Sequence, residues 1–191
     1  GGGCAGAAAG NLAAAAGRGA EGTIDNIAPA IGVSGPSKTV TNTGTVTFTV
    51  TYTGADIITL NPSDITLNKT GTADATVEVS GDGSTTRTVT LHAITGDGTL
   101  GIRVNADSAS DFAGNLAPAS NATSTFAVDN TPPVAIISNP SKYLTTAGPI
   151  VYTVTYQNYS SISLTPADII LNKTGTADGT VTLSGSTAVR T

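Results

Sequence analysis

The chain has 191 residues, a formal net charge of −5 and 11% charged residues, less than half the usual share. It contains neither a run of about 18 apolar residues nor a basic patch, so a membrane-spanning helix is excluded and nucleic acid is not expected as a partner. One Cys and one His can form neither an intrachain disulfide nor a Cys/His zinc site.

From residue 30 onward, apolar and polar residues alternate with a period of two. Thr alternates with Val46, Phe48, Val50 and Tyr52, which predicts a strand with one face in a core and the other in water. Gly, Pro, Asn and Asp separate the further strands expected at 30–33, 65–68, 76–80, 87–93, 100–104 and 123–128. No apolar 3.6-residue period holds for three turns, so the sequence predicts an all-β fold.

The sequence also repeats itself at an offset of 104 residues. DITLNKTGTAD at 64–74 returns as DIILNKTGTAD at 168–178, and AGNLA at 9–13 returns at 113–117. No gap is needed until near the end, where Arg190 matches Arg87. The chain therefore divides into the C-terminal tail of one unit (1–25), a complete unit (26–130) and the N-terminal part of a third (131–191).

About seven short strands in each unit of 104 residues are typical of two packed antiparallel sheets. We therefore expect tandem immunoglobulin-like β-sandwiches. The chain lacks the disulfide and core Trp of antibody domains. Stability is left to the burial of Val, Ile, Leu and a few aromatic side chains, at about 25 cal/mol per Å².

Two explanations of the incomplete units stay open. The chain is either a window on a longer array, or a subunit whose tail completes a neighbour's unfinished domain by strand addition. Pairing 1–25 with 131–191 would still lack the counterpart of residues 89–104, which favours the window. The absence of Met agrees with a window or a processed piece.

Several phrases carry a resemblance that covers the chain after about Ala9. DSASDFAGNLA at 107–117, followed by FAVDNTPP at 126–133, resembles the end of bacterial Ig-like, cadherin-like tandem repeats of large surface and secreted adhesins. TGDGTL at 95–100 is similar to the same family. Two departures are the first linker, which reads DNIAP at 25–29, and the Ala/Gly-rich residues 1–8, which lack counterparts of Asp107 and Asp111.

Catalysis finds little support among the residues. His92 lies in an alternating run on the face opposite Val89 and Leu91, and nothing marks a nucleophile or orienting partner for it, so a solvent-facing strand histidine is expected. Cys4 has no basic neighbour to stabilise a thiolate. We therefore expect no catalytic residue and no enzyme.

Calcium is the chemical candidate, because hard cations need clustered oxygen ligands. Asp107, Asp111 and Asn115 recur every four residues, and Asp129 and Asn130 lie at the junction with the next unit. The resemblance implies that such junctional carboxylates hold neighbouring repeats in line. The alternative is that these Asp and Asn side chains form turns through local hydrogen bonds. Apart from calcium, no cofactor is expected.

Modification is a separate expectation. Asn-x-Thr or Asn-x-Ser sequons that would accept a glycan in an organism with the machinery occur at four positions: Asn68, Asn121, Asn158 and Asn172.

Three functions follow as expectations. The first is a noncatalytic extracellular module, the stalk or fibre of a cell-surface adhesin, with neighbouring repeats as partners and a host or neighbouring-cell glycan or protein as the target of the whole. The second is a filament or surface-layer subunit that joins identical subunits head to tail by strand complementation. The third is an accessory binding domain of a secreted glycan-active enzyme, with Tyr52, Phe112, Tyr143, Tyr156 and Tyr159 as its aromatic candidates.

Overall fold

The computed structural model describes residues 23–191. It is all-β, which confirms the predicted class: its helical segments among these residues are two single-turn 3-10 helices, η1 (Pro62–Asp64) and η2 (Pro166–Asp168). None of the helices in the described part has the length and apolar character needed to cross a membrane. The expected tail at 1–25, with Cys4, lies almost entirely outside the described residues.

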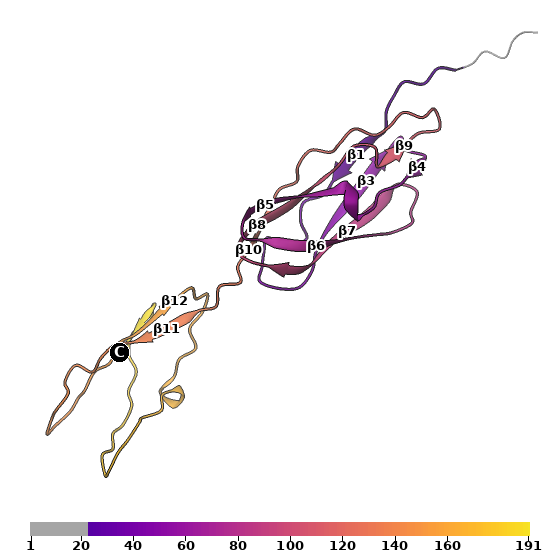
Figure 1. The fold of residues 1–191 in the computed structure, drawn as a ribbon. Helices are drawn as coiled ribbons and strands as arrows, with labels where there is room; N and C mark the ends of the chain where they lie inside the picture. The colour runs from indigo at the N-terminus through magenta and orange to yellow at the C-terminus, as the bar shows by residue number, and fades with distance from the viewer. Residues whose placement is uncertain (1–22) are drawn as a thin grey trace, which may run out of the picture.

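Residues 30–128 form two four-stranded sheets (Figure 1). The first has the order β1 (Ala30–Val33), β3 (Val46–Thr53), β7 (Thr86–Thr95) and β6 (Asp74–Ser80), with every pair antiparallel. The second has the order β2 (Val40–Thr41), β10 (Phe126–Val128), β8 (Gly98–Val104) and β5 (Ile65–Gly71), and its β2–β10 pair is parallel. Two short strands, β4 (Ile57–Ile58) and β9 (Ala109–Ser110), pair with each other.

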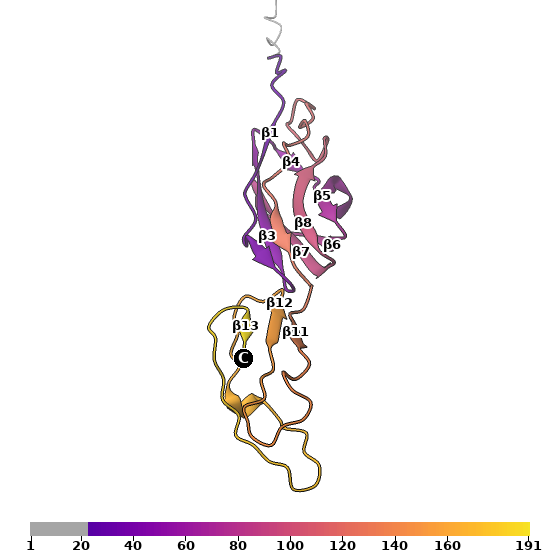
Figure 2. The same cartoon turned by 90° about the vertical axis from the view of Figure 1, so that its left-hand side faces the viewer.

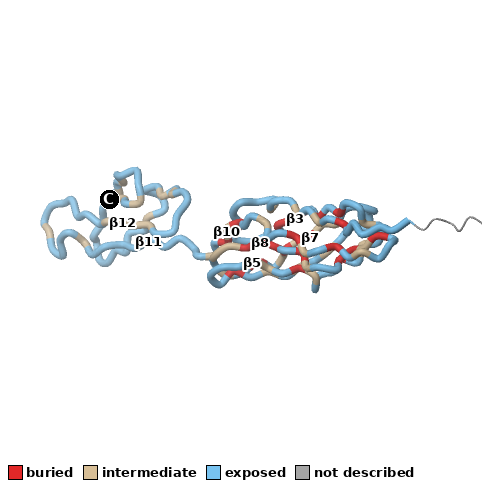
Figure 3. The backbone as a smooth tube through the Cα atoms, turned by 90° about the horizontal axis from the view of Figure 1, so that it is seen from above, coloured by how far each residue is buried: buried red, intermediate tan, exposed pale blue. Residues whose placement is uncertain are grey.

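The core consists of inward-facing residues of both sheets. Figure 3 colours the buried residues along the backbone red. In β3 the apolar residues of the alternating run are at most 2% exposed, while Thr49, Thr51 and Thr53 face water. Further fully buried side chains come from β7, β8 and β10, among them Val89, Leu91, Leu100, Ile102, Val104 and Phe126. The period of two therefore assigns the core face, as expected from the pleat of a strand.

The turn between β7 and β8 explains the Gly-Asp-Gly phrase. Gly96 has a φ of 71°, and a Cβ there would lie 2.0 Å from the Thr72 carbonyl oxygen. Gly98 has a φ of 142°, and a Cβ there would lie 2.1 Å from the Thr70 carbonyl oxygen. Only glycine fits such a backbone at so close an approach. The turn is thereby held against the end of β5.

Residues 134–190 contain one three-stranded sheet, β11 (Val134–Ile137), β12 (Val154–Gln157) and β13 (Val189–Arg190), in that order. At the repeat offset these strands correspond to β1, β3 and β7, which are neighbours in the same order in the first sheet. The register also corresponds, since Val134 is opposite Gln157 as Ala30 is opposite Thr53. Figures 1 and 2 show this sheet beyond the β10 end of the first part.

The counterparts of β5 and β6, residues 169–175 and 178–184, form no strand. In the complete unit β5 pairs with β8, and β6 pairs with residues 88–95 of β7. The counterparts of β8 and of β7 beyond Thr88 fall past Thr191, while Thr191 itself pairs with Ser184 as Thr88 pairs with Ser80. Residues of the C-terminal part whose counterparts face the core are consequently open to water. Ile150 is 42% exposed and Tyr152 47%, whereas their counterparts Val46 and Phe48 are 0% and 1% exposed.

Candidate functional site

Asp111 and Asn115 close the loop that follows β9. Both carboxylate oxygens of Asp111 accept hydrogen bonds from Asn115, at 2.8 Å from its backbone N–H and 2.8 Å from its side-chain amide. The side-chain bond from Asn115 is the main reason that the pKa of Asp111 is lowered. The same amide donates to the Asp25 carbonyl oxygen at 2.9 Å, so this loop holds the linker that precedes the unit.

Asp107 and Asp56 lie at the same end of the unit and form different hydrogen bonds. Asp107 is exposed, has a φ of 68° and donates its backbone N–H to the Ala117 carbonyl. Asp56 accepts a hydrogen bond from the Phe112 N–H at 2.9 Å, which ties the β4 side to the loop. Sequence reasoning did not single out Asp56, since an Asp before a strand looks like an ordinary turn residue.

Asp129 and Asn130 lie at the opposite end, beside β10 (Figure 1). Asp129 accepts the Thr131 N–H at 3.1 Å, as Asp25 accepts the Ile27 N–H at 2.9 Å in the first linker. Asn130 bonds the β7–β8 turn twice: its backbone N–H donates to Asp97 and its side-chain amide to the Gly96 carbonyl, each at 2.6 Å. The linker is therefore attached to the unit that it leaves.

The five predicted calcium ligands do not gather in one place. Asp107, Asp111 and Asn115 lie at one end of the unit and Asp129 and Asn130 at the other. Asp111 already uses both oxygens on Asn115, and within residues 23–191 no three His, Cys, Asp or Glu side chains are placed to share a metal. The five residues as placed do not form one calcium shell together. Calcium stays a prediction, which melting with and without chelator tests.

The four sequons differ in access. Asn121, Asn158 and Asn172 are exposed. In Asn68, by contrast, the side-chain nitrogen is buried and has no hydrogen-bond partner among the described residues. A glycan would be attached through that nitrogen, so Asn68 is shielded in the folded unit while its counterpart Asn172 is open.

His92 is half-buried in β7, opposite Thr76 of β6, and its neighbour Leu91 is fully buried. A register shift between Asp74 and Thr76 lies beside it. Among the described residues, His92 belongs to no group of three or more His, Cys, Asp or Glu side chains.

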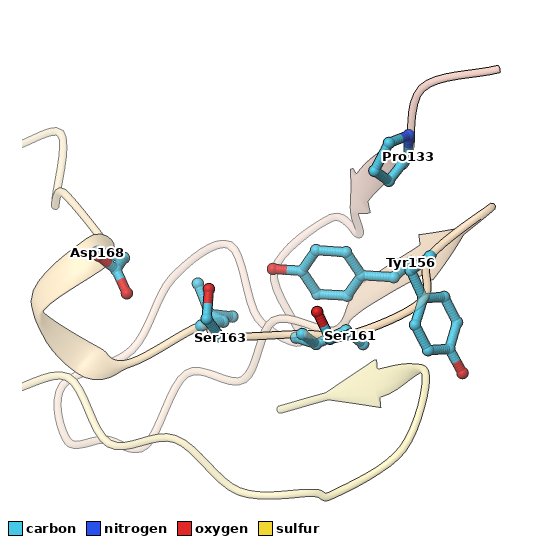
Figure 4. Close-up of a pocket in the computed structure, with 8 residues that line it drawn as sticks. Pro133, Tyr156, Ser161, Ser163 and Asp168 are labelled. Atoms are coloured by element: carbon cyan, nitrogen blue, oxygen red, sulfur yellow. The ribbon is translucent and has the colours of Figure 1, made fainter. Parts of the chain in front are cut away.

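One cavity, of ≈ 310 Å³, opens in the C-terminal part (Figure 4). The linker contributes Pro133 and β12 contributes Tyr156, and the segment after β12 supplies the rest of the wall: Tyr159, Ser161, Ile162, Ser163, Leu164 and Asp168. Two of the five aromatic candidates therefore share one cavity. Of the others, Tyr52 is buried at 2% exposure, whereas Phe112 and Tyr143 are 85% and 82% exposed.

Neither a family model nor a curated protein nor a solved structure matches this chain. This geometry shows the first linker bound by the unit that follows it, the second linker bound by the unit that precedes it, and a cavity in the C-terminal part. The repeat in the sequence could have indicated the cavity, because the offset of 104 residues shows which strands of the complete unit have no counterpart in the C-terminal part.

Proposed function

We propose that this chain is a noncatalytic structural module of an extracellular repeat protein. In this proposal the units are tandem immunoglobulin-like β-sandwiches that form the stalk or fibre of a cell-surface adhesin. The fold supports it with two facing sheets around one core in residues 30–128 and a matching three-stranded sheet in residues 134–190. The polar, Thr-rich and weakly acidic surface suits a soluble array.

The observation that carries the proposal is the way the linker is held. Asp25 and Asn26 correspond to Asp129 and Asn130 at the repeat offset. Asn130 is bound by the turn of the unit before it, and the Asp25 carbonyl is bound by Asn115 of the unit after it. If the two linkers are superposed, they give one junction. In it the Asp residue is held by the unit after the linker and the next residue, Asn, is held by the unit before it.

Such a junction restricts bending without a metal. Pro132 and Pro133 follow it directly, and proline fixes φ near −65° and removes the backbone donor. Repeats of constant length on stiff linkers would carry a distal binding domain away from the cell surface. The mechanism is thus geometric, and Asn130 and Asn115 are its principal residues.

The junction is tested by Asn130→Ala, with Asn121→Ala as a matched exposed control. We expect the amides of residues 129–131 to be as rigid as those of β10 in ¹⁵N relaxation of the unmodified chain and of the control. In N130A these linker amides should show lower order parameters, because the two bonds that hold them to the β7–β8 turn are affected. Mobile 129–131 amides in the unmodified chain, or no change in N130A, would contradict the held linker.

The cellular part of the proposal is tested by antibody labelling of intact cells that produce the protein. Labelling without permeabilisation is the expected result. Labelling only after permeabilisation would remove the surface assignment.

The second candidate is a filament subunit assembled by strand complementation. One observation favours it: the inward face of the C-terminal part is open, with Tyr152, Ile150 and Leu171 all at least 39% exposed. A strand from another chain could add to that sheet, as in β-augmentation. Residues 1–25 correspond to a repeat tail but supply no counterpart of β8, so this candidate leaves one strand position empty.

A further inference from the structure

The sequence contains three Asp-Gly pairs, at 82–83, 97–98 and 178–179. In such a pair the glycine nitrogen can attack the carboxyl carbon of the preceding side chain and close a five-membered succinimide ring. Glycine favours this reaction because it has no Cβ to crowd the ring and leaves the backbone free to turn. The fold holds the three pairs in different ways, so their reactivity should differ.

Asp178 presents its carboxylate to the residue that follows it. The Gly179 N–H donates to Asp178 Oδ1 at 2.8 Å. Because that oxygen is bonded to the carboxyl carbon, the nitrogen lies beside the atom that it would attack, as in a near-attack conformer. The Asp178 side chain is 72% exposed, and a Cβ at Gly179 would meet nothing within 4 Å. The carboxyl group therefore has room to rotate toward the nitrogen.

The contact is local, because it recurs in the complete unit. Asp74 and Ala75 correspond to Asp178 and Gly179 at the repeat offset, and the Ala75 N–H donates to Asp74 Oδ1 at 2.9 Å. There the bond is formed although Asp74 begins the paired strand β6. The geometry thus does not depend on whether the segment is paired. Only the second residue differs, and alanine carries the Cβ that hinders ring closure.

Asp97 is the contrasting case. Its backbone N–H donates to Thr72 Oγ1 at 3.0 Å, and its carbonyl accepts the Thr72 N–H at 2.9 Å. Its carboxylate accepts the Asn130 N–H at 2.6 Å, so turning it toward the Gly98 nitrogen would break a bond to the linker. Asp82 lies in the exposed turn between β6 and β7 and has no such contact among the described residues.

Lys173 moderates the reaction at Asp178. Its ammonium nitrogen lies 3.0 Å from Asp178 Oδ1, and this hydrogen bond is the main reason that the pKa of Asp178 is lowered. Ring closure expels a carboxyl oxygen as water, which requires the neutral acid. Since Lys173 favours the ionised form, it should slow the cyclisation without displacing the Gly179 nitrogen.

We propose that Asp178 is a site of spontaneous isoaspartate formation and that the contacts of Asp97 protect it from the same modification. The Gly179 nitrogen bonds to the Asp178 carboxyl carbon, and its proton leaves with the carboxyl OH as one water molecule. Water then opens the succinimide. Hydrolysis at the side-chain carbonyl restores aspartate, whereas hydrolysis at the backbone carbonyl leaves the main chain running through the side chain. The total mass is unchanged, and water is the only co-reactant.

The test incubates the full chain at neutral pH and physiological temperature for several weeks. Trypsin then separates the three pairs onto peptides 70–87, 88–103 and 174–190, and fragment ions locate isoaspartate in each. A sample digested at the start corrects for conversion during digestion, and Asp82 reports that cyclisation proceeds in the buffer. We expect isoaspartate at Asp178 to form at least about tenfold faster than at Asp97. Equal rates at the two sites, or none at Asp178, would overturn the proposal.

Two variants and one denaturant separate the chemistry from the fold. Gly179→Ala copies the native Asp74–Ala75 pair and should slow isoaspartate formation at Asp178 severalfold. Lys173→Gln removes the ammonium group and should speed it severalfold. In urea, where the contacts of Asp97 are lost, Asp97 and Asp178 should react alike. An unchanged rate in G179A, no faster rate in K173Q, or a difference that persists in urea would each contradict the proposal.

Discussion

Two segments of nearly identical sequence have different structures in this chain. Residues 65–71 read ITLNKTG and form strand β5, while residues 169–175 read IILNKTG and form none. The first segment pairs along its whole length with β8. The second has no such partner within the sequence, because the counterpart of β8 falls past Thr191. A partner strand, and not local propensity, therefore decides whether this sequence forms a strand.

Short-range contacts behave differently and recur in both parts. A Pro-containing 3-10 turn with a capping box precedes each segment, at η1 and η2. The Lys69–Asp74 ion pair of 2.9 Å returns as Lys173–Asp178 at 3.0 Å. These contacts span at most five residues, so they need no partner from far along the chain. What differs between the parts is the long-range pairing.

The largest expected difference between the parts concerns the core. Phe48→Ala should lower the free energy of unfolding by about 3–5 kcal/mol, because Phe48 is buried at 1% exposure. Its counterpart Tyr152 is 47% exposed, and Tyr152→Ala should change unfolding of the complete unit by less than about 0.5 kcal/mol. Urea denaturation of both variants measures this. Equal losses would mean that Tyr152 is buried as Phe48 is.

Next comes a matched pair of glycines. Gly71 and Gly175 have φ angles of 62° and 61°, but a Cβ at Gly71 would lie 2.3 Å from the Asp97 carbonyl oxygen, whereas one at Gly175 meets nothing within 4 Å. Both alanine variants carry the left-handed cost of about 1–2 kcal/mol, and G71A adds a backbone clash. We expect G71A to destabilise the complete unit by about 2–4 kcal/mol and G175A to leave its denaturation midpoint unchanged.

A smaller effect is expected from the buried hydroxyl pair. Tyr52→Phe removes the partner of Ser108 and should cost about 1 kcal/mol. Tyr156→Phe, at the counterpart position, should leave the stability of the chain unchanged, because no described residue bonds its hydroxyl. The same denaturation series compares the two. A loss in Y156F as large as that in Y52F would argue that the cavity is already filled.

The sequence predicted much of this because its strongest signals are periodic. Alternation placed Val46, Phe48, Val50 and Tyr52 on the core face, and the offset of 104 residues aligned the sheet of the C-terminal part. Two-residue strands such as β4 and β9 carry too few residues to show a period. The Asn130 and Asn115 contacts were also beyond prediction, since an amide's partner depends on which loops the fold brings together.

The acid sensitivity that Asp111 contributes should be confined to the complete unit. The pKa of Asp111 is lowered in the folded state by its hydrogen bonds from Asn115, and the counterpart of Asp111 falls past Thr191. A lowered folded pKa adds stability above the unfolded value of about 3.9, and this stability is lost as the pH falls through the folded pKa. Asp111→Asn should therefore reduce the fall in melting temperature as the pH is lowered below about 4. An unchanged fall would show that other carboxylates control it.

The most direct measurement compares amide hydrogen exchange of residues 65–71 and 169–175 before and after the missing partners are supplied. In the chain as it stands, residues 65–71 should be protected and residues 169–175 should exchange freely. Appending residues 89–130 after Thr191 continues the register in which Thr191 corresponds to Thr88. Residues 169–175 should then gain the protection that β5 has. Unchanged exchange in the extended chain would contradict it.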